Sequence, residues 1–269
     1  MAHRPSGISP IFTMPTTLSL VPKAPLPQPT LHSECSGTSD RCAFSHECLS
    51  TGYRRNELEA LHGLVEHMQE HDEGKHLFRR GEPFRAIYAV RSGCVKTSIY
   101  SRDGREQVLG FYLPGEVVGL NAIYPDCYPC DAIALESTTF CRFSFPAMSR
   151  LAAEVPVVQN HLFRLLSREL GMASMLAGDH TADERVAAFL LDLGERQGRR
   201  EHSTTVFHFP MSRSDMANYL RLAPETVSRV LSRFRDRGWV DITGRHARLR
   251  DPVALREVGA PLLQAAAAG

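Results

Sequence analysis

Hydrophobic and polar positions alternate along the chain with two different periods. From about Leu77 to Phe145, short alternating runs are separated by turns that contain glycine, and Arg102–Arg105 has the composition of a hairpin turn. Runs at this spacing predict antiparallel strands in a sandwich or barrel. After Pro146 the apolar positions follow a helical period, as they also do in a short stretch around Arg54–Glu70. The pattern therefore predicts an α+β protein in which a strand-rich domain is followed by helices.

A long helix is predicted directly after the strand-rich domain. Its key positions are spaced by four and three residues, and they are Val158, Leu162, Leu165, Glu169, Met172 and Leu176. This spacing predicts a coiled-coil seam between two copies of the chain, although an amphipathic helix that packs on its own domain has the same period. In a seam, each Glu169 would meet its own copy. The like charges would oppose association, so the dimer would form only under some conditions. A Glu169 that points into water would have no such role.

Two short helices with a tight junction are predicted near the C-terminus. Ser212 with Asp215 has the spacing of a helix start, Pro224 suits the first turn of the second helix, and Gly238 ends it. The helical period divides the second helix into an apolar side with Val227, Val230, Leu231 and Phe234 and a polar side with Glu225, Ser228, Arg229 and Ser232. One side is therefore expected to be buried and the other to face a ligand.

The polar side of this helix matches the chemistry of DNA bases. Arginine can donate a fork to guanine, glutamate can accept from cytosine, and serine can do either. Ser212 and Arg213, at the start of the first helix, are further candidate contacts. Nine arginines against four carboxylates give residues 211–250 a net charge of +5, whereas the whole chain carries only +1. An ordinary helical hairpin with a solvated face has the same period, but the turn, the faces and the local charge together favour a DNA interface.

Composition indicates a folded protein with a different kind of segment at its start. The 269 residues are 43% hydrophobic and 23% charged, which suits about two domains, and Thr181 with Glu184 predicts a helix start where a new domain begins. Residues 1–34 are rich in proline, serine and threonine and predict a disordered tail. No apolar run is long enough to span a membrane or to form a secretory signal, so we expect a cytoplasmic protein without membrane contact. Seven cysteines in a reducing compartment point to metal binding or redox sensing.

The strand-rich domain, the long helix and the segment PETVSRVLSRF at residues 224–234 together resemble the family of the cyclic-AMP receptor protein and the fumarate and nitrate reductase regulator. The resemblance extends from about Cys42 to Val240. It implies a cyclic-nucleotide-binding-like β-roll (a jelly roll), a dimerisation helix and a C-terminal winged helix-turn-helix, with a wing that turns at Gly244. The implied organisation is a tail at 1–34, a cysteine-bearing loop at 35–50, the β-roll at 51–150, the dimerisation helix at 151–180 and the DNA-binding domain at 181–269.

The resemblance also implies partners. In the branch that carries Glu-Thr-Val-Ser-Arg at the recognition helix, Glu225, Ser228 and Arg229 would contact bases of double-stranded DNA. The implied target is a palindrome of the type TTGAT, four bases, ATCAA, bound by a homodimer. The hairpin at Asp103-Gly104 would contact RNA polymerase. The resemblance implies a transcription activator and no enzyme.

The cyclic-nucleotide branch of the family carries Gly-Glu-Leu, whose glutamate binds ribose, and Arg-Ser-Ala, whose arginine binds the cyclic phosphate. The matching stretches here read Gly119-Leu120-Asn121 and Asp131-Ala132-Ile133. An aspartate repels the phosphate that an arginine attracts. We therefore expect no cyclic nucleotide to bind.

The oxygen-sensing branch holds a four-iron four-sulfur cluster on four cysteines, three of them N-terminal. Cys42 and Cys48 match the last two N-terminal ligands, and Cys141 matches the ligand in the β-roll. The usual first ligand would fall at position 39, which is Ser39, so we assign Cys35 as the fourth ligand. These residues predict anaerobic regulation through an iron-sulfur cluster, and a haem, nitric oxide or thiol switch is the alternative.

The other cysteines have weaker patterns. Cys94 is expected to be a small buried apolar residue. Cys127 and Cys130 form a C-x2-C pair, which could be a redox pair, substitute ligands or an incidental surface pair. A metal-dependent oxygenase built on the barrel is disfavoured, because such sites use clustered histidines and no histidine lies between Leu77 and Asn160.

Overall fold

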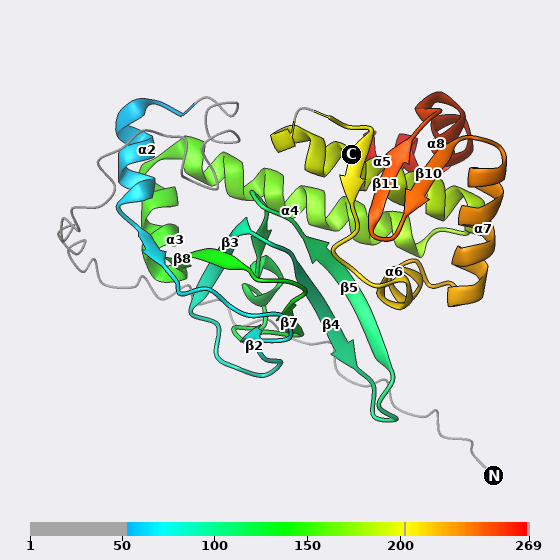
Figure 1. Ribbon diagram of the computed structural model, residues 1–269. Helices are drawn as coiled ribbons and strands as arrows, with labels where there is room; N and C mark the ends of the chain where they lie inside the picture. Colours follow the sequence, from blue (N-terminus) through cyan, green and yellow to red (C-terminus); the bar gives the residue numbers. More distant parts are fainter. Residues whose placement is uncertain (1–52, 202, 268–269) are drawn as a thin grey trace, which may run out of the picture. The chain divides into compact units, whose positions relative to one another are not determined.

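Two antiparallel four-stranded sheets form the first part of the fold, which we call the sensor domain after the role that the family resemblance implies. The computed structural model describes residues 53–201 and 203–267. One sheet has the order β1-β8-β3-β6 and the other β2-β7-β4-β5 (Figure 1). The strands are β1 (Val65–His67), β2 (His76–Phe78), β3 (Ala86–Ser92), β4 (Val95–Tyr100), β5 (Glu106–Tyr112), β6 (Val117–Val118), β7 (Asp131–Ala134) and β8 (Thr139–Ser144). The predicted β-roll is thus confirmed, and the predicted hairpin joins β4 to β5.

The helix predicted at Arg54–Glu70 is shorter than expected. Helix α2 covers Arg55–His62 and ends at Gly63, and strand β1 follows it. Strand β1 pairs with β8, where Val65 lies opposite Phe143. A local helical period cannot anticipate this pairing, because the partner strand lies far away in the sequence.

Helix α3 (Phe145–Glu154) and the long helix α4 (Pro156–Ala177) follow the sheets. The predicted seam positions of α4 pack on the helix's own domain. Val158 is 1% exposed in the sensor core, and Leu162 and Leu165 pack against the same core. Val158, Leu162 and Leu165 therefore pack as the alternative of an amphipathic helix on its own domain predicts, while the side chains of Met172 and Leu176 lie outside the described part.

A second apolar stripe of α4 faces outward. Phe163, Leu166 and Leu170 are 59%, 37% and 71% exposed, and their spacing of three and four residues puts them on one side of the helix. Glu169 is not part of this exposed stripe. Its carboxylate accepts a hydrogen bond of 3.1 Å from the Tyr112 hydroxyl of β5 in the same chain. Its role as a dimer switch stays a prediction, but the geometry differs from the predicted seam.

The second part of the fold, which we call the DNA-binding domain, is built from helices and a three-stranded sheet of order β10-β11-β9. Its elements are α5 (Ala182–Glu201), β9 (Val206–His208), α6 (Arg213–Tyr219), α7 (Pro224–Asp236), β10 (Val240–Thr243), β11 (His246–Leu249) and α8 (Pro252–Ala267). Thr181 and Glu184 cap the start of α5 as predicted. Strand β9 and helix α8 were not predicted, and α8 packs on α5.

A buried carboxylate, Glu116, lies where three elements meet. It follows β5 and accepts hydrogen bonds from Arg168 of α4 and Arg196 of α5, at 2.6 to 2.8 Å. Arg196 is itself 95% buried, since its side chain keeps only 5% of its accessible surface, and it also pairs with Asp192. Opposite charges at this distance attract each other strongly where little water screens them, and the loss of either partner would leave the other buried without a counter-charge.

No helix among the described residues has the length and apolar character needed to cross a membrane.

Replacing Glu116 with glutamine tests this buried carboxylate. Burial raises the pKa of Glu116, but the charges and hydrogen bonds of Arg196 and Arg168 together outweigh burial, so the pKa falls from 4.5 to about 2. The stabilisation is therefore complete above pH 4.5 and disappears as the pH falls towards 2. We expect Glu116→Gln to lower the free energy of unfolding at pH 7 by about 3 to 5 kcal/mol, because Arg196 stays buried without its partner.

Urea unfolding measures the free energy of unfolding at each pH. Between pH 5 and 2.5, this free energy should fall more steeply for the parent than for Glu116→Gln. Glu225→Gln, at an exposed position of α7, is the control and should follow the parent. Parallel curves for Glu116→Gln and the parent would contradict the assignment.

Candidate nucleic-acid interface

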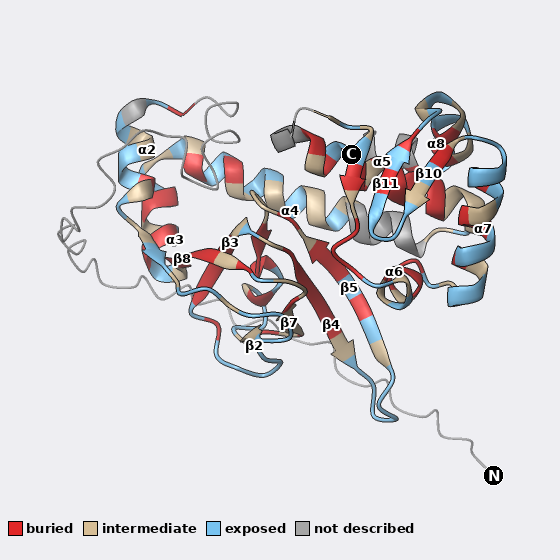
Figure 2. Ribbon diagram, in the orientation of Figure 1, coloured by how far each residue is buried: buried red, intermediate tan, exposed pale blue. Residues whose placement is uncertain are grey.

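Helix α7 separates its two faces as the period predicts. It begins at Pro224, which is suited to the first turn because this position needs no backbone donor. The buried face consists of Val227, Val230, Leu231 and Phe234, which are at most 6% exposed. Glu225, Ser228 and Arg229 are exposed on the other face, and Ser232 is half-buried beside them. Packing of the apolar face thus leaves the predicted reading side open (Figure 2).

The junction before α7 is tight. Helix α6 starts with a reciprocal cap in which the Asp215 amide donates to the Ser212 hydroxyl at 3.0 Å, and the Ser212 amide donates to the Asp215 carboxylate. Arg221, between the two helices, has a φ of 57°, a left-handed conformation that is uncommon for a residue with a side chain. Its backbone conformation contributes to the turn between α6, which ends at Tyr219, and α7, which begins at Pro224. The predicted helix-turn-helix is therefore present.

The two predicted contacts at the start of α6 have different surroundings. The Ser212 hydroxyl is already occupied, since it donates to the Asp215 carboxylate at 2.6 Å. The Arg213 guanidinium lies 4.5 Å from the centre of the Phe209 ring, and burial lowers the pKa of Arg213 without neutralising it. Arg213 forms no ion pair with any described carboxylate, so its charge is available to a phosphate.

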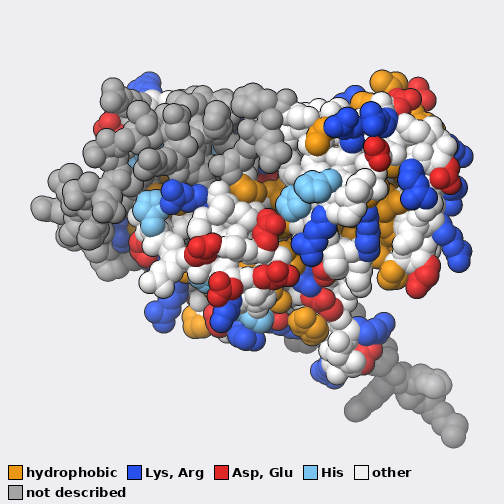
Figure 3. All heavy atoms as spheres, viewed as in Figure 1, with side chains coloured by type: hydrophobic (Ala, Val, Ile, Leu, Met, Phe, Trp, Pro, Cys, Tyr) orange, Lys and Arg blue, Asp and Glu red, His pale blue; other side chains and the backbone are white. Residues whose placement is uncertain are grey.

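Positive charge surrounds α7. Of the nine arginines between residues 211 and 250, three form ion pairs with described carboxylates: Arg233 with Asp183, Arg235 with Asp236, and Arg250 with Asp241. The other six have no such partner in the described part of the chain. Figure 3 shows arginine side chains gathered on the surface of the DNA-binding domain. This positively charged surface can therefore bind an anionic polymer.

The predicted wing is also present. Strands β10 and β11 pair from Val240 opposite Leu249 to Thr243 opposite His246, and the turn contains Gly244 with a φ of 61°. Strand β9 extends this sheet on the far side of β11. Arg245 is exposed in the turn. The wing therefore adds a cationic edge beside the two helices.

The four predicted cluster ligands are only partly covered by the structure. Cys141 lies in β8, is 1% exposed, and stands opposite His67 of β1, with 3.9 Å between its sulfur and the Nδ1 atom of His67. Cys35, Cys42 and Cys48 lie outside the described residues. Among the residues that are described, no group of three or more His, Cys, Asp or Glu side chains has the geometry of a metal site.

The remaining cysteines are free thiols. Cys94 is fully buried in a hydrophobic core, as predicted, and burial raises its pKa. Cys130 is also buried, with a raised pKa, and accepts a hydrogen bond of 3.6 Å from the Asn121 amide. Cys127 is half-buried and forms no disulfide with Cys130. Burial of Cys130 leaves it a poor nucleophile.

The positions that match the cyclic-nucleotide motifs have their own roles in the fold. Leu120 is 2% exposed and starts a short 3-10 helix, Leu120–Ala122. The Asp131 carboxylate accepts a hydrogen bond of 2.8 Å from the Arg80 amide. An apolar side chain and an acid therefore stand where that branch of the family has an acid and an arginine.

The structure also joins residues that the sequence patterns did not single out. Lys96 of β4 pairs with Asp215 at 2.7 Å and with Glu106 at 2.9 Å. Asn218 of α6 donates to the Glu106 carbonyl and accepts from the Val108 amide, each at 2.8 Å. No periodicity reports such pairs, because more than one hundred residues separate Asn218 from Val108.

Comparison with known proteins agrees with this architecture. Residues 184–258 match the family described as the Crp-like helix-turn-helix domain, and residues 68–154 match the cyclic nucleotide-binding domain. Transcriptional activator protein FnrA of Stutzerimonas stutzeri is 38% identical over 217 residues, which cover 80% of this chain and 89% of that protein. The transcriptional regulatory protein btr of Bordetella pertussis is 38% identical over 220 residues, covering 81% and 91%. The solved structure of FixK2 from Bradyrhizobium japonicum is 30% identical with a TM-score of 0.65, covering 72% of this chain and 96% of that one.

A sensor domain of the cyclic-nucleotide-binding type followed by a winged helix-turn-helix defines a class of transcription regulator. The chain belongs to the Crp/Fnr family of these regulators.

Proposed function

We propose that this protein is a DNA-binding transcription regulator of the anaerobic response, and that it binds a palindrome of the type TTGAT, four bases, ATCAA as a dimer. The observation that carries the proposal is the open polar face of α7, with Glu225, Ser228 and Arg229 exposed opposite a buried apolar face. Relatives named as transcriptional activators, and one from Pasteurella multocida named anaerobic regulatory protein, support it.

Each exposed residue of α7 has a proposed role in the major groove. Arg229 donates a fork to guanine, Glu225 accepts from the amino group of cytosine, and Ser228 keeps acceptor capacity because its hydroxyl hydrogen is donated to the Pro224 carbonyl at 2.9 Å. Ser212 and Ser232 are proposed as further contacts to the DNA. Arg213 binds a backbone phosphate, which positions the helix without reading sequence.

Replacing Arg229 with alanine tests the reading face. Loss of a bidentate contact to guanine should weaken binding to the palindrome by about tenfold to hundredfold, which corresponds to about 1 to 3 kcal/mol. Binding to a scrambled duplex should weaken much less. Gel retardation under anaerobic conditions measures both.

Arg235→Ala is the matched control, because Arg235 is exposed on another side of α7 and pairs with Asp236. It should affect both duplexes alike. The proposal fails if the parent protein retains the palindrome no better than the scrambled duplex.

We propose that the second copy packs on the outer stripe of α4. A palindrome has twofold symmetry, and a dimer with a twofold axis presents one α7 to each half-site. The exposed side chains of Phe163, Leu166 and Leu170 supply the apolar surface for such a contact. Glu169, beside this stripe, then affects association through its hydrogen bond to Tyr112 and through its charge.

Leu166→Lys tests this dimer surface. A lysine would meet its own copy near the axis and would remove apolar contact. Burial of a leucine side chain contributes about 1.5 kcal/mol or more, so we expect the dimer dissociation constant to rise tenfold or more. Sedimentation equilibrium of anaerobic protein measures it. Ser149→Lys, at an exposed position of α3, should leave the constant unchanged. Equal constants for Leu166→Lys and the parent would rule out this surface.

We further propose that the regulator senses oxygen through a four-iron four-sulfur cluster held by Cys35, Cys42, Cys48 and Cys141. Four thiols are the donor set that such a cluster needs, and when bound it supplies a redox-active group that oxygen attacks. Tyr53 lies only five residues after Cys48, a reach of roughly 18 Å at most. Tyr53 belongs to the same hydrophobic core as Cys141, which supports a common site.

The sensor core offers a route from this site to the dimer helix. The Tyr53 ring packs edge-on against His161 of α4, with ring centres 6.0 Å apart. Anchoring the cysteine-bearing segment on β8 therefore holds Tyr53, and Tyr53 holds the first half of α4. We propose that this contact favours the dimeric arrangement of α4 when oxygen is absent.

Anaerobic purification tests the sensor. We expect a broad visible absorbance with about four iron and four sulfide per chain, lost in Cys141→Ser and kept in the control Cys127→Ser. A sharp Soret band would instead indicate haem. A colourless protein whose DNA binding responds to thiol oxidants would indicate a thiol switch.

Two further roles complete the proposal. The exposed hairpin tip at Asp103-Gly104 contacts RNA polymerase, since it projects beyond the paired residues of β4 and β5. Binding to chromosomal DNA assigns the protein to the cytoplasm.

A further inference from the structure

We infer that Glu116 is a positioning residue that couples dimer formation on α4 to the docking of the DNA-binding domain on the sensor sheet. The inference rests on the proposed dimer but not on the proposed DNA sequence. A second copy packed on α4 restricts the position of Arg168. Through its ion pair, Arg168 then restricts the carboxylate of Glu116, and Glu116 restricts Arg196 of α5 in the same way.

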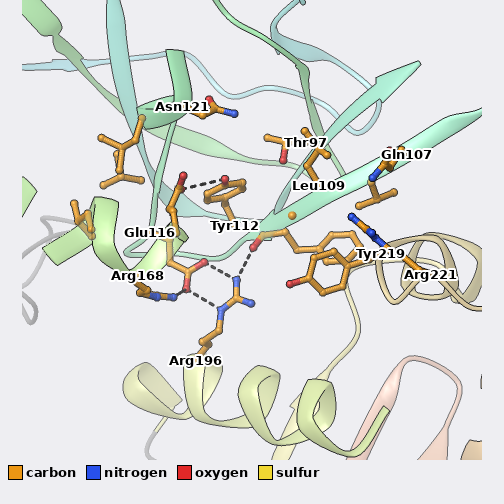
Figure 4. Close-up of a pocket in the computed structure, with 17 residues that line it drawn as sticks. Thr97, Gln107, Leu109, Tyr112, Glu116, Asn121, Arg168, Arg196, Tyr219 and Arg221 are labelled. Carbon is orange, nitrogen blue, oxygen red and sulfur yellow. Dashed lines mark hydrogen bonds and ion pairs between the residues drawn. The ribbon is translucent and has the colours of Figure 1, made fainter. Parts of the chain in front are cut away.

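The geometry around Glu116 joins three parts of the chain (Figure 4). One carboxylate oxygen accepts from Arg168 at 2.6 Å and from the Nε atom of Arg196 at 2.8 Å. The other accepts from Nη2 of Arg196 at 2.6 Å and from the Leu113 amide at 2.9 Å. Both oxygens are therefore saturated with donors from β5–β6, α4 and α5. A shift of any one donor changes the position of the carboxylate for the others.

Arg168 links this network to the dimer surface. It lies on α4 between Leu166 and Leu170, which belong to the exposed apolar stripe. Its side chain is 33% exposed, whereas that of Glu116 is 11% exposed. A rotation of α4 about its axis therefore moves Arg168 together with the apolar stripe.

Arg196 links the same network to the helix-turn-helix. It is on α5, the first helix of the DNA-binding domain, and it also donates to the Phe111 carbonyl of β5. Beside it, α6 is held on β4 and β5 through Lys96 with Asp215 and through Asn218 with the backbone of β5. The sensor sheet therefore contacts α5 and α6 and leaves the polar face of α7 open.

The packing next to the network leaves room for movement. A cavity of about 380 Å³ is lined by Leu165 and Glu169 of α4, Tyr112 and Leu109 of β5, and residues of α5 and α6. The later part of α4 borders this cavity through Leu165 and Glu169, whereas Val158 and Leu162 hold its earlier part in the sensor core, so we expect movement mainly in the later part. A second copy on the stripe restricts that motion, which is how dimer formation would tighten the docking.

The Val108 amide is a direct reporter of docking, because it donates to the Asn218 side chain across the two domains. We propose to measure its hydrogen exchange by NMR in the full chain, at concentrations below and above each protein's own dimerisation midpoint. In the parent, exchange should slow at least about fivefold on dimerisation, the lower end of usual coupling between sites. In Arg168→Gln, dimerisation should slow this exchange by less than about twofold.

Arg164→Gln is the matched control, since Arg164 is an exposed arginine one turn earlier on α4. It should behave as the parent does. Glu116→Gln, if it folds, should abolish the effect as well. The inference is overturned if dimerisation slows exchange of the Val108 amide as much in Arg168→Gln as in the parent, or if it does not slow exchange in the parent. It is also overturned if Arg168→Gln no longer dimerises. A parent that dimerises and shows the effect, but does not prefer the palindrome, would refute the proposed DNA target and leave this inference standing.

Discussion

The burial of one carboxylate constrains how the sensor and DNA-binding domains fit together. Glu116 is removed from water, so its charge must be balanced by donors that protein elements bring to it. Arg168 and Arg196 come from different helices, and Arg196 is buried too. Because each charge depends on the others, the elements that carry them have little freedom to separate without exposing an unpaired charge. This requirement fixes α5 on the sensor sheet, and the pairs of Asp215 with Lys96 and of Asn218 with the β5 backbone fix α6 beside it.

The same docking leaves the proposed DNA-reading surface accessible. Contacts from β4 and β5 reach α6 through Asp215 and Asn218, while Glu225 and Arg229 of α7 stay exposed. Helix α7 is held by its apolar face within its own domain, because Phe234 and its buried neighbours pack there. A sensor that holds the first helix of the pair can therefore orient the second without covering it. This arrangement is compatible with the proposed control of DNA binding by the first part of the fold.

Helix α4 shows where a sequence period is insufficient. Two apolar stripes run along this helix, one through Leu162 and Leu165 and one through Phe163 and Leu166. Both have the spacing of a helix face, so the period alone could not tell which stripe packs inside the domain. The sensor sheets decide it by covering Leu162 and Leu165. The acid between the stripes, Glu169, consequently meets Tyr112 of the same chain.

Features that depend on residues three or four positions apart were determined by the sequence alone. The cap of Ser212 with Asp215, the start of α7 at Pro224 and the division of α7 into two faces belong to this group, because a helix brings such residues together whatever surrounds it. Only the tertiary structure decided that Glu116 meets Arg196, eighty residues later in the chain. It also added β9 to the wing and α8 to α5, since pairing and packing depend on distant partners that no local period records.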